Sequence, residues 1–159
     1  MTSVTNLMRN ALIQALLIAC IALGTTKSKA VEQSAENLYR AKDYQGAYQA
    51  WLSRANQGDP AAQEALAKML INGEGRQPDY AAAITWLRKS ASQGYHPAEV
   101  DLGMAYEIGM GVKINPAESF KWYYRAAQSG DRNIQNIIGR MYEGGQGVSQ
   151  NFKKAAEWY

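Results

Sequence analysis

The chain has 159 residues, of which 47% are hydrophobic and 19% are charged, a balance that excludes a disordered chain and favours a folded globular unit. Three basic side chains and no acidic one fall within residues 1–30, so the remainder carries 14 basic and 14 acidic side chains. A body without net charge has no field that attracts phosphate, so the composition disfavours binding to nucleic acid or to an anionic membrane surface.

The amino-terminal segment is typical of an export signal. Residues 11–24 form an apolar run after Arg9, and this run is shorter than the roughly 20 residues that cross a bilayer as a helix. Small residues at and before Ala30 predict cleavage after it. Two alternatives stay open, because residues 17–20 also match a lipobox with a lipidated Cys20, and the signal could remain as an uncleaved anchor. We therefore expect a periplasmic or secreted protein, or else a membrane-anchored lipoprotein.

A period of 36 residues follows the signal segment. Residues 31–61 form a first, less regular hairpin, whose turn lacks the glycines of the later copies and is expected to be tighter. Residues 62–97 superpose without gaps on residues 98–133, and a shorter third copy occupies residues 134–159. A fixed period of about 20 to 50 residues is typical of a solenoid of stacked units. We therefore expect an all-α protein of about three and a half antiparallel helix hairpins.

Recurring polar residues and glycines mark the ends of the second helix of each hairpin. The side chains that can cap its start lie 36 residues apart, at Asp43, Asp79, Asn115 and Asn151. Pro116 fits the first helical position, where its missing amide hydrogen does no harm. The glycines that can end these helices are Gly58, Gly94 and Gly130. The second helices are therefore expected to span roughly four turns.

Tryptophan recurs at the same period within the second helices, at Trp86, Trp122 and Trp158. Their helical spacing favours positions in the hydrophobic core over a surface on which ligands stack. Replacement of Trp122 with alanine is then expected to cost about 3 to 5 kcal/mol of stability.

Glycine recurs at two further places. One position of the first helices is small in each of the three later copies, at Ala67, Gly103 and Gly139. This smallness predicts a close crossing of the paired helices, because glycine inside a helix costs about 1 kcal/mol. A Gly-x-Gly triplet joins the two helices of each later hairpin, at Gly73 and Gly75, Gly109 and Gly111, and Gly145 and Gly147. A phosphate-binding loop is disfavoured, since no Gly-Lys-Ser/Thr follows these triplets.

The segment LGMAYEIGMGVKINPAESFKWYYRAAQSG at residues 102–130, echoed at residues 138–159, resembles the Sel-one-like repeats, a branch of the tetratricopeptide-repeat superfamily. This resemblance implies a right-handed α-solenoid of stacked antiparallel helix hairpins that acts as an adaptor or scaffold for protein complexes. Bacterial members of the family are often exported. Some secreted relatives carry cysteine pairs in each repeat, and penicillin-binding or β-lactamase activity has been attributed to them. No repeat of this chain contains a cysteine.

Residues that serve catalysis or metal binding are scarce. His96 is the only histidine and Cys20 the only cysteine, which disfavours both a nucleophile with its base and a metal site. We expect His96 to be a solvated residue of the turn between two repeats. We therefore expect a protein that is not an enzyme and has no catalytic, cofactor or metal site. A penicillin-binding or β-lactamase-like exported enzyme is the alternative.

The surface that stacked first helices create is the expected binding site. Solenoids of helix hairpins commonly bind partners on a concave face, which the first helices line. The residues expected to contact a protein or peptide there are Glu64, Lys68, Ile71, Val100, Met104, Glu107, Asn136, Arg140 and Glu143. An ordinary solvated surface is the alternative for each of them.

The last repeat is shorter than the period requires. A final helix after Asn151 would have about nine residues, which is marginal alone, and a solenoid needs a cover for its last apolar face. Three alternatives stay open: the end frays, a partner or second copy covers Trp158, or the gene product is shortened. A structural periplasmic homodimer formed through this end is therefore a third functional class.

Overall fold

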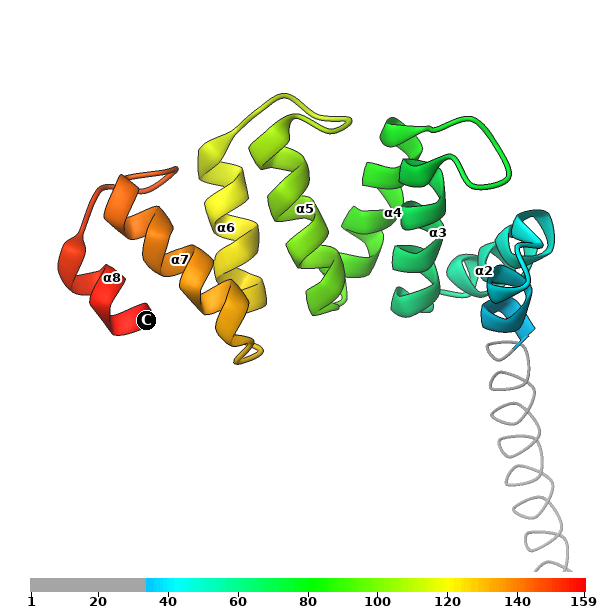
Figure 1. Ribbon diagram of the computed structural model, residues 1–159, viewed down its shortest axis with the longest axis horizontal. Coiled ribbons are helices and arrows are strands. Elements are labelled where there is room, and N and C mark those ends of the chain that lie inside the picture. Colours follow the sequence, from blue (N-terminus) through cyan, green and yellow to red (C-terminus); the bar gives the residue numbers. More distant parts are fainter. Residues whose placement is uncertain (1–33) are drawn as a thin grey trace, which may run out of the picture. The chain divides into compact units, whose positions relative to one another are not determined.

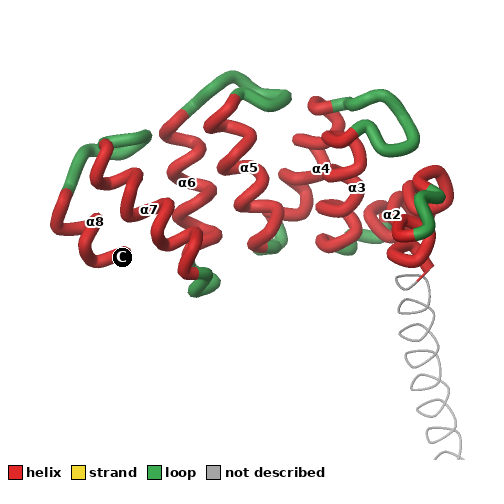
Figure 2. The backbone as a smooth tube through the Cα atoms, viewed as in Figure 1, coloured by secondary structure: helices red, strands yellow, loops and turns green. Residues whose placement is uncertain are grey.

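The computed structural model describes residues 34–159, so the expected export signal, including Ala30 and Cys20, lies outside the described residues. The described part consists of helices joined by short turns and contains no strand (Figure 2). The expected all-α fold is therefore confirmed. The chain divides into two compact units, Met1–Ala50 and Trp51–Tyr159.

The described part of the first unit is a short helical segment followed by the start of α2 (Tyr44–Asn56). Residues 34–40 are helical, and the chain then reverses through Lys42, whose φ of 63° is left-handed. Asp43 caps α2, because its Oδ1 accepts a 2.9 Å hydrogen bond from the Gly46 amide. A single left-handed residue thus closes the turn that lacks a glycine triplet.

The second unit is a row of helices in which each helix packs against the next one along the chain (Figure 1). The helices are α3 (Pro60–Asn72), α4 (Tyr80–Ser92), α5 (His96–Ile108), α6 (Pro116–Ala127), α7 (Arg132–Gly144) and α8 (Phe152–Trp158). The hairpins α3–α4, α5–α6 and α7–α8 are successive repeats, and contacts of α4 with α5 and of α6 with α7 join them. The unit is an α-solenoid, as the period predicts.

The predicted caps of the second helices are present. The side chains of Asp79, Asn115 and Asn151 accept hydrogen bonds of 2.9, 3.2 and 2.9 Å from backbone amides three residues further on. Pro116 occupies the first turn of α6. The predicted terminators Gly58, Gly94 and Gly130 all have positive φ. These helix ends therefore follow from local chemistry that repeats with the sequence.

Two first helices have caps that the sequence analysis did not predict. The Asp59 carboxylate accepts hydrogen bonds from the Ala62 amide at 3.0 Å and from Arg54 at 2.6 Å. Partial burial alone would raise the pKa of Asp59, but these bonds hold it below its ordinary value. Asp131 caps α7 at the same register, whereas α5 has Tyr95 there and no side-chain cap. Because Tyr95 interrupts the series between Asp59 and Asp131, the 36-residue period does not reveal this cap.

The second glycine of the triplet also shapes the contact between repeats. A Cβ atom on Gly111 would lie 2.7 Å from the carbonyl oxygen of Tyr80, and one on Gly147 would overlap the carbonyl oxygen of Pro116. Tyr80 and Pro116 are the first residues of α4 and α6. The turn of one repeat therefore rests directly on the second helix of the preceding repeat, an approach that only glycine permits.

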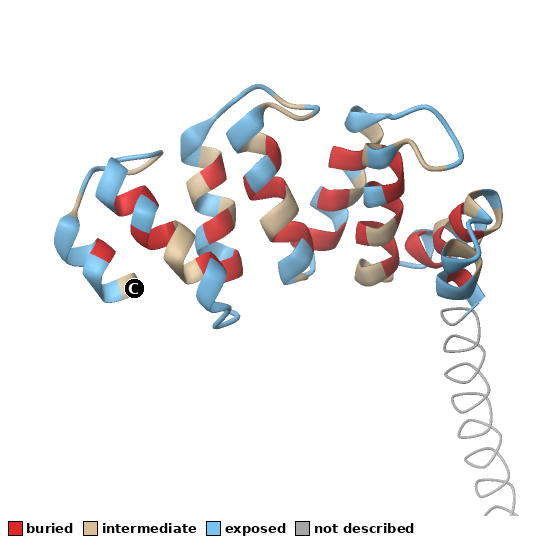
Figure 3. Cartoon of the chain, viewed as in Figure 1, coloured by how far each residue is buried: buried red, intermediate tan, exposed pale blue. Residues whose placement is uncertain are grey.

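Aliphatic side chains and alanines, rather than tryptophans, dominate the core. Buried residues lie along the sides where neighbouring helices adjoin, and fully buried aliphatic side chains include Leu66, Leu87, Leu102 and Ile138 (Figure 3). Small residues beside them, such as Ala83, let the helices approach closely.

The prediction that the recurring tryptophans are core residues is wrong. Trp86, Trp122 and Trp158 are all only half-buried. The Nζ of Lys89 lies 4.1 Å from the centroid of the Trp86 ring, and the Arg125 guanidinium lies 4.8 Å from that of Trp122. Each of these two rings thus has a basic side chain over its face. Helical spacing showed that tryptophan recurs on one side of the helix, but not whether that side lies at the centre or edge of the packing.

Candidate partner-binding face

The predicted binding residues lie on α3, α5 and α7, and we call the solvent-facing side of these helices the first-helix face. Its exposed members are Lys68, Met104, Glu107, Arg140 and Glu143. The half-buried members are Ile71, Val100 and Asn136. Glu64 is buried, with only 8% of its surface exposed, so it offers little surface for a direct contact. Binding of a partner at these residues stays a prediction.

An acidic cluster joins α3 to α5 on this face. Glu64 forms an ion pair with Lys68, one turn further along α3. Partial burial alone would lower the pKa of Lys68, but the hydrogen bond that Lys68 donates to Glu64 and the charge of Asp101 raise it. Asp101 on α5 is half-buried, and its Oδ2 has no hydrogen-bond partner within residues 34–159. Glu64 therefore keeps Lys68 charged and in place.

Burial of Asp101 raises its pKa to about 6, Glu64 adds to this effect, and Lys68 opposes it. The sequence analysis missed Asp101 because the same register holds Ala65 in the preceding repeat and Ile137 in the following one. A residue without a counterpart in other copies gives no periodic signal. Only the tertiary structure, in which α4 packs against both α3 and α5, brings Asp101 within electrostatic range of Glu64 and Lys68.

Two tyrosines, one on α6 and one directly after α8, hydrogen-bond two of the predicted glutamates. The Tyr123 hydroxyl donates a 3.0 Å hydrogen bond to Oε2 of Glu107, and 36 residues later Tyr159 donates a 2.7 Å bond to Oε2 of Glu143. Burial, followed by the charge of Glu107, raises the pKa of Tyr123, so this phenol remains a donor at neutral pH. The recurrence of these glutamates thus has a structural cause that the sequence analysis did not identify.

The same tyrosines explain the small residues of the first helices. A Cβ atom on Gly103 would lie 2.8 Å from the Tyr123 ring, and one on Gly139 would lie 2.7 Å from the Tyr159 ring. The predicted close crossing is therefore present. In the preceding repeat the positions of glycine, tyrosine and glutamate hold Ala67, Leu87 and Ile71. The glycine, the tyrosine that packs on it and the glutamate that accepts from that tyrosine are therefore present or absent together in a repeat.

His96 is exposed to solvent, as expected, and it also contacts a polar network around a buried carboxylate. It is the first residue of α5, and its Nδ1 lies 2.9 Å from Oε2 of Glu99. Glu99 is 2% exposed, and its Oε1 lies 2.9 Å from the Arg125 guanidinium. Arg125 also donates a 3.2 Å hydrogen bond to the carbonyl of Ala91. The network therefore ties α4, α5 and α6 together, and a buried carboxylate needs such partners.

Acidic groups outnumber basic ones at and just beneath the first-helix face, if buried Glu64 and half-buried Asp101 are counted with the exposed residues. The acidic groups are Glu64, Asp101, Glu107 and Glu143, and the basic groups are Lys68 and Arg140. Arg140 is close enough to lower the pKa values of both Tyr123 and Tyr159, although other influences outweigh it. The arrangement can attract positive charge, which favours basic partners over acidic ones.

Within residues 34–159, no three histidine, cysteine, aspartate or glutamate side chains are grouped as they would need to be to hold a metal ion. Over the same residues, no helix combines the length and the apolar character that a membrane span requires. The groups that the structure does bring together on the first-helix face are carboxylates, phenols and two basic side chains. Such groups are suited to recognition through charge and hydrogen bonds.

Comparison with known proteins identifies the repeats. The sequence model of the Sel1 repeat matches residues 60–95, 96–131 and 135–159. A Sel1 repeat protein from Oxalobacter formigenes has a similar structure, with a TM-score of 0.75 and 32% identity over 80% of this chain. A protective antigen of uropathogenic Escherichia coli that displays an SLR fold aligns with a TM-score of 0.79 and 35% identity over 83% of this chain. No curated protein matches the sequence.

The fold is also shared with the cysteine-rich protein B of Helicobacter pylori, at a TM-score of 0.56 and 22% identity over 73% of this chain and 83% of that protein. The chain covers 52% of the Oxalobacter protein and 29% of the Escherichia antigen, so it spans about half or less of the length of these two. With three matching repeats and a shared fold, the chain belongs to the Sel1 repeat family.

Proposed function

We propose that this protein is a non-enzymatic adaptor that binds a protein or peptide partner on the first-helix face. The observation that carries the proposal is the pair of hydrogen bonds that Tyr123 and Tyr159 donate to Glu107 and Glu143 at the same register of neighbouring repeats. Side chains that are held before binding lose less conformational entropy when a partner arrives. Membership of the family supports this role, because Sel1 repeats typically form protein-interaction scaffolds and are generally non-catalytic.

The excess of carboxylates on this face favours a partner segment rich in lysine or arginine. Met104, which is 41% exposed, and Ile108, which is 60% exposed, add apolar surface on α5 between the charged positions. A few apolar anchors surrounded by charge are typical of specific protein interfaces. Charge attraction of this kind accelerates association and weakens as salt is added.

Site-specific photocrosslinking in the native cell tests the binding face. A photoreactive residue replaces Met104 on α5, and the matched control replaces Lys121, an exposed residue of α6. We expect the probe at position 104 to capture a defined partner and the probe at position 121 to capture none. Binding of that purified partner should weaken with salt and with the double substitution Glu107→Gln and Glu143→Gln.

Three results would contradict the adaptor proposal. Equal capture by both probes would remove the preference for the first-helix face. Turnover of nitrocefin or covalent capture of labelled penicillin would support the enzyme attributed to cysteine-rich relatives. A dimer in light scattering that forms through the carboxyl-terminal end, together with no partner captured at position 104, would support the structural alternative.

We also propose that the protein is exported, on the basis of the apolar run at residues 11–24 behind Arg9. Intact-mass measurement of the protein from the periplasm and membrane fractions distinguishes the forms. Loss of residues 1–30 would support a cleaved signal, and a chain that starts at a lipidated Cys20 would support a lipoprotein. A full-length chain in the membrane would support an uncleaved anchor, whereas a full-length chain in the cytoplasm alone would contradict export.

A further inference from the structure

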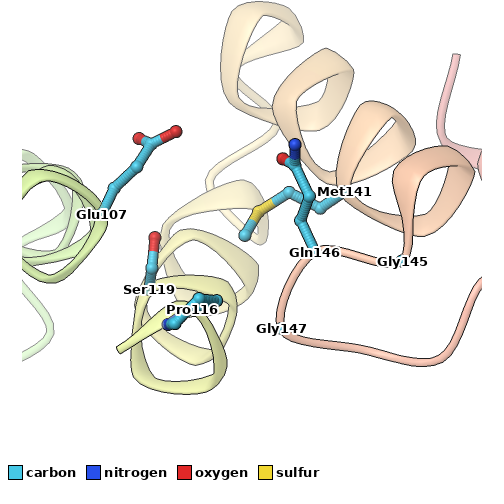
Figure 4. Close-up of a pocket in the computed structure, with 7 residues that line it drawn as sticks. All are labelled: Glu107, Pro116, Ser119, Met141, Gly145, Gln146 and Gly147. Carbon is cyan, nitrogen blue, oxygen red and sulfur yellow. The ribbon is translucent and has the colours of Figure 1, made fainter. Parts of the chain in front are cut away.

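A pocket lies where α5 and α6 meet the turn that follows α7 (Figure 4). Its volume is about 320 Å³, and the side chains that line it include Glu107, Pro116, Ser119, Met141 and Gln146. The close approach of the turn to the backbone of Pro116 forms part of this junction. The pocket therefore lies between two repeats, and it includes one of the carboxylates of the first-helix face.

Ser119 places an unsatisfied hydroxyl in this pocket. The residue is 1% exposed, and its Oγ has no hydrogen-bond partner within the described part of the chain. In Figure 4 the hydroxyl points into the space between Glu107 and Met141, and Gln146 lies across that space from Glu107. A buried hydroxyl without a partner is costly, so a native fold that keeps one calls for an explanation.

The polar character of this pocket is specific to one junction of the solenoid. Its polar lining residues are Glu107, Ser119 and Gln146, and the residues at the same register of the preceding repeat junction are Ile71, Ala83 and Met110. The position of Ser119 is also alanine in the last repeat, at Ala155. Repeat packing alone therefore does not require the serine. Glu107 is accounted for by its hydrogen bond from Tyr123, but Ser119 has no partner among the described residues, so its change from the apolar residue points to a polar ligand.

We propose that this pocket receives a lysine or arginine side chain of the protein partner, an inference that rests on the proposed function. The cationic group accepts no hydrogen bonds and donates several, which matches the acceptors that the pocket offers. These acceptors are the Glu107 carboxylate, the Ser119 hydroxyl and the carboxamide oxygen of Gln146. The aliphatic part of the incoming side chain packs against Met141 and Pro116, as long basic side chains commonly do.

The charges around the pocket favour a cation over an anion. Glu107 uses Oε2 to accept the hydrogen bond from Tyr123, and the structure gives its Oε1 no partner among the described residues. The positive end of the α6 dipole would favour an anion, but Pro116 has no amide hydrogen, and the Glu118 amide donates to Asn115. A cation in the pocket can therefore contact the free Glu107 Oε1. The repulsion that it meets from the amino-terminal end of α6 is reduced.

Amide NMR spectra of the purified protein, titrated with blocked amino acids, test the proposal. The probes are N-acetyl-lysine methylamide, the norleucine derivative as a neutral analogue of similar length, and the glutamate derivative as an anion. We expect saturable shifts of the Ser119 and Gln146 amides with the lysine derivative and much weaker shifts with the other two. Equal shifts with norleucine would show an apolar groove, a preference for glutamate would show an anion site, and no saturable shift with lysine would overturn the proposal.

Two conservative variants locate the effect. Ser119→Ala introduces the residue found at this register in two other repeats, and Glu107→Gln keeps an acceptor for Tyr123 while removing the charge. Each variant should weaken binding of the lysine derivative by about fivefold or more, as expected for hydrogen bonds to a charged group. Glu118→Gln, a charge-removing control on the same helix, should leave binding unchanged. Unaltered binding by both pocket variants would overturn the proposal.

The two proposals fail separately. If the photocrosslinker at Met104 captures a partner but that partner binds the Ser119→Ala and Glu107→Gln variants as it binds the native protein, only the pocket proposal fails. If the crosslinker captures nothing while the lysine derivative still binds the pocket, the adaptor proposal fails and the pocket is a site for a free basic ligand. Within the crosslinked partner, mass spectrometry should place a lysine or arginine beside the captured segment.

Discussion

The hydroxyl of Tyr123 donates a 3.0 Å hydrogen bond to the Glu107 carboxylate. The ring of this tyrosine also lies against Gly103, one turn before the glutamate on α5, where an added Cβ would be 2.8 Å away. Tyr123 is 4% exposed, so the ring has little room to move aside. Glycine therefore allows the second helix to bring a phenol to the first-helix face.

Gly103→Ala should destabilise the protein by about 1 to 3 kcal/mol, because overpacking against a held ring outweighs the better helix propensity of alanine. The same substitution in a Tyr123→Leu background, which restores the Ala67 and Leu87 combination of the preceding repeat, should be neutral or stabilising. Urea denaturation of the four proteins in this cycle measures the effect. An equal cost in both backgrounds would show that the ring is not the cause.

Asp101→Asn should stabilise the protein at pH 7 and above. Since burial raises the pKa of Asp101 from its ordinary value to about 6, the native state binds this proton more tightly than the unfolded chain does. The contribution of Asp101 to the free energy of unfolding therefore falls as the pH rises from about 4 to 6, and it stays constant above pH 6.

The advantage of Asp101→Asn should be close to zero near pH 4 and grow to about 1 to 2 kcal/mol above pH 6, because partial solvent access and Lys68 limit the penalty. Denaturation of both proteins at pH 4, 5, 6, 7 and 8 checks this window, with Glu64 and Lys68 unchanged. A variant that is less stable than the native protein at pH 8 would show that the carboxylate is needed for the fold.

Arg125→Gln should destabilise the protein more than Glu99→Gln does. The first change leaves Glu99, which is 2% exposed, without its guanidinium partner, at a cost of about 2 kcal/mol or more. The second removes the charge and introduces the residue that the other repeats hold at this register, Gln63 and Gln135. Thermal unfolding of the two variants and their combination tests this ranking. The combined cost should be smaller than the sum, and strict additivity would contradict the ion pair.

Trp122→Ala should cost about 1 to 2 kcal/mol, less than a core residue, because the indole is only half-buried under Arg125. Leu102→Ala, which empties a fully buried site on the neighbouring helix, should cost about 2 to 5 kcal/mol and provides the comparison. The denaturation midpoints of both variants show which substitution costs more stability. A larger loss for Trp122 than for Leu102 would restore the core assignment.

The candidate site was only partly predictable. Glu107 and Glu143 were chosen because they recur on the first helices, and both are exposed there. Glu64 was chosen by the same rule but is buried beside Lys68. Periodicity identifies the helix and the register, whereas exposure depends on the neighbouring helix. Asp101 and Ser119 occur once in their registers, so comparison between the repeats gave no reason to choose them.

The sequence by itself determined the helices, their order and their ends, because caps such as Asn115 and terminators such as Gly94 act on the backbone within a few residues of themselves. The 36-residue period then made the same hairpin recur, so a stacked α-solenoid followed. The tertiary structure alone decided which side chains meet across helices. Glu99 with Arg125 and the pocket around Ser119 depend on the distances between helices, and no local interaction in the sequence sets those distances.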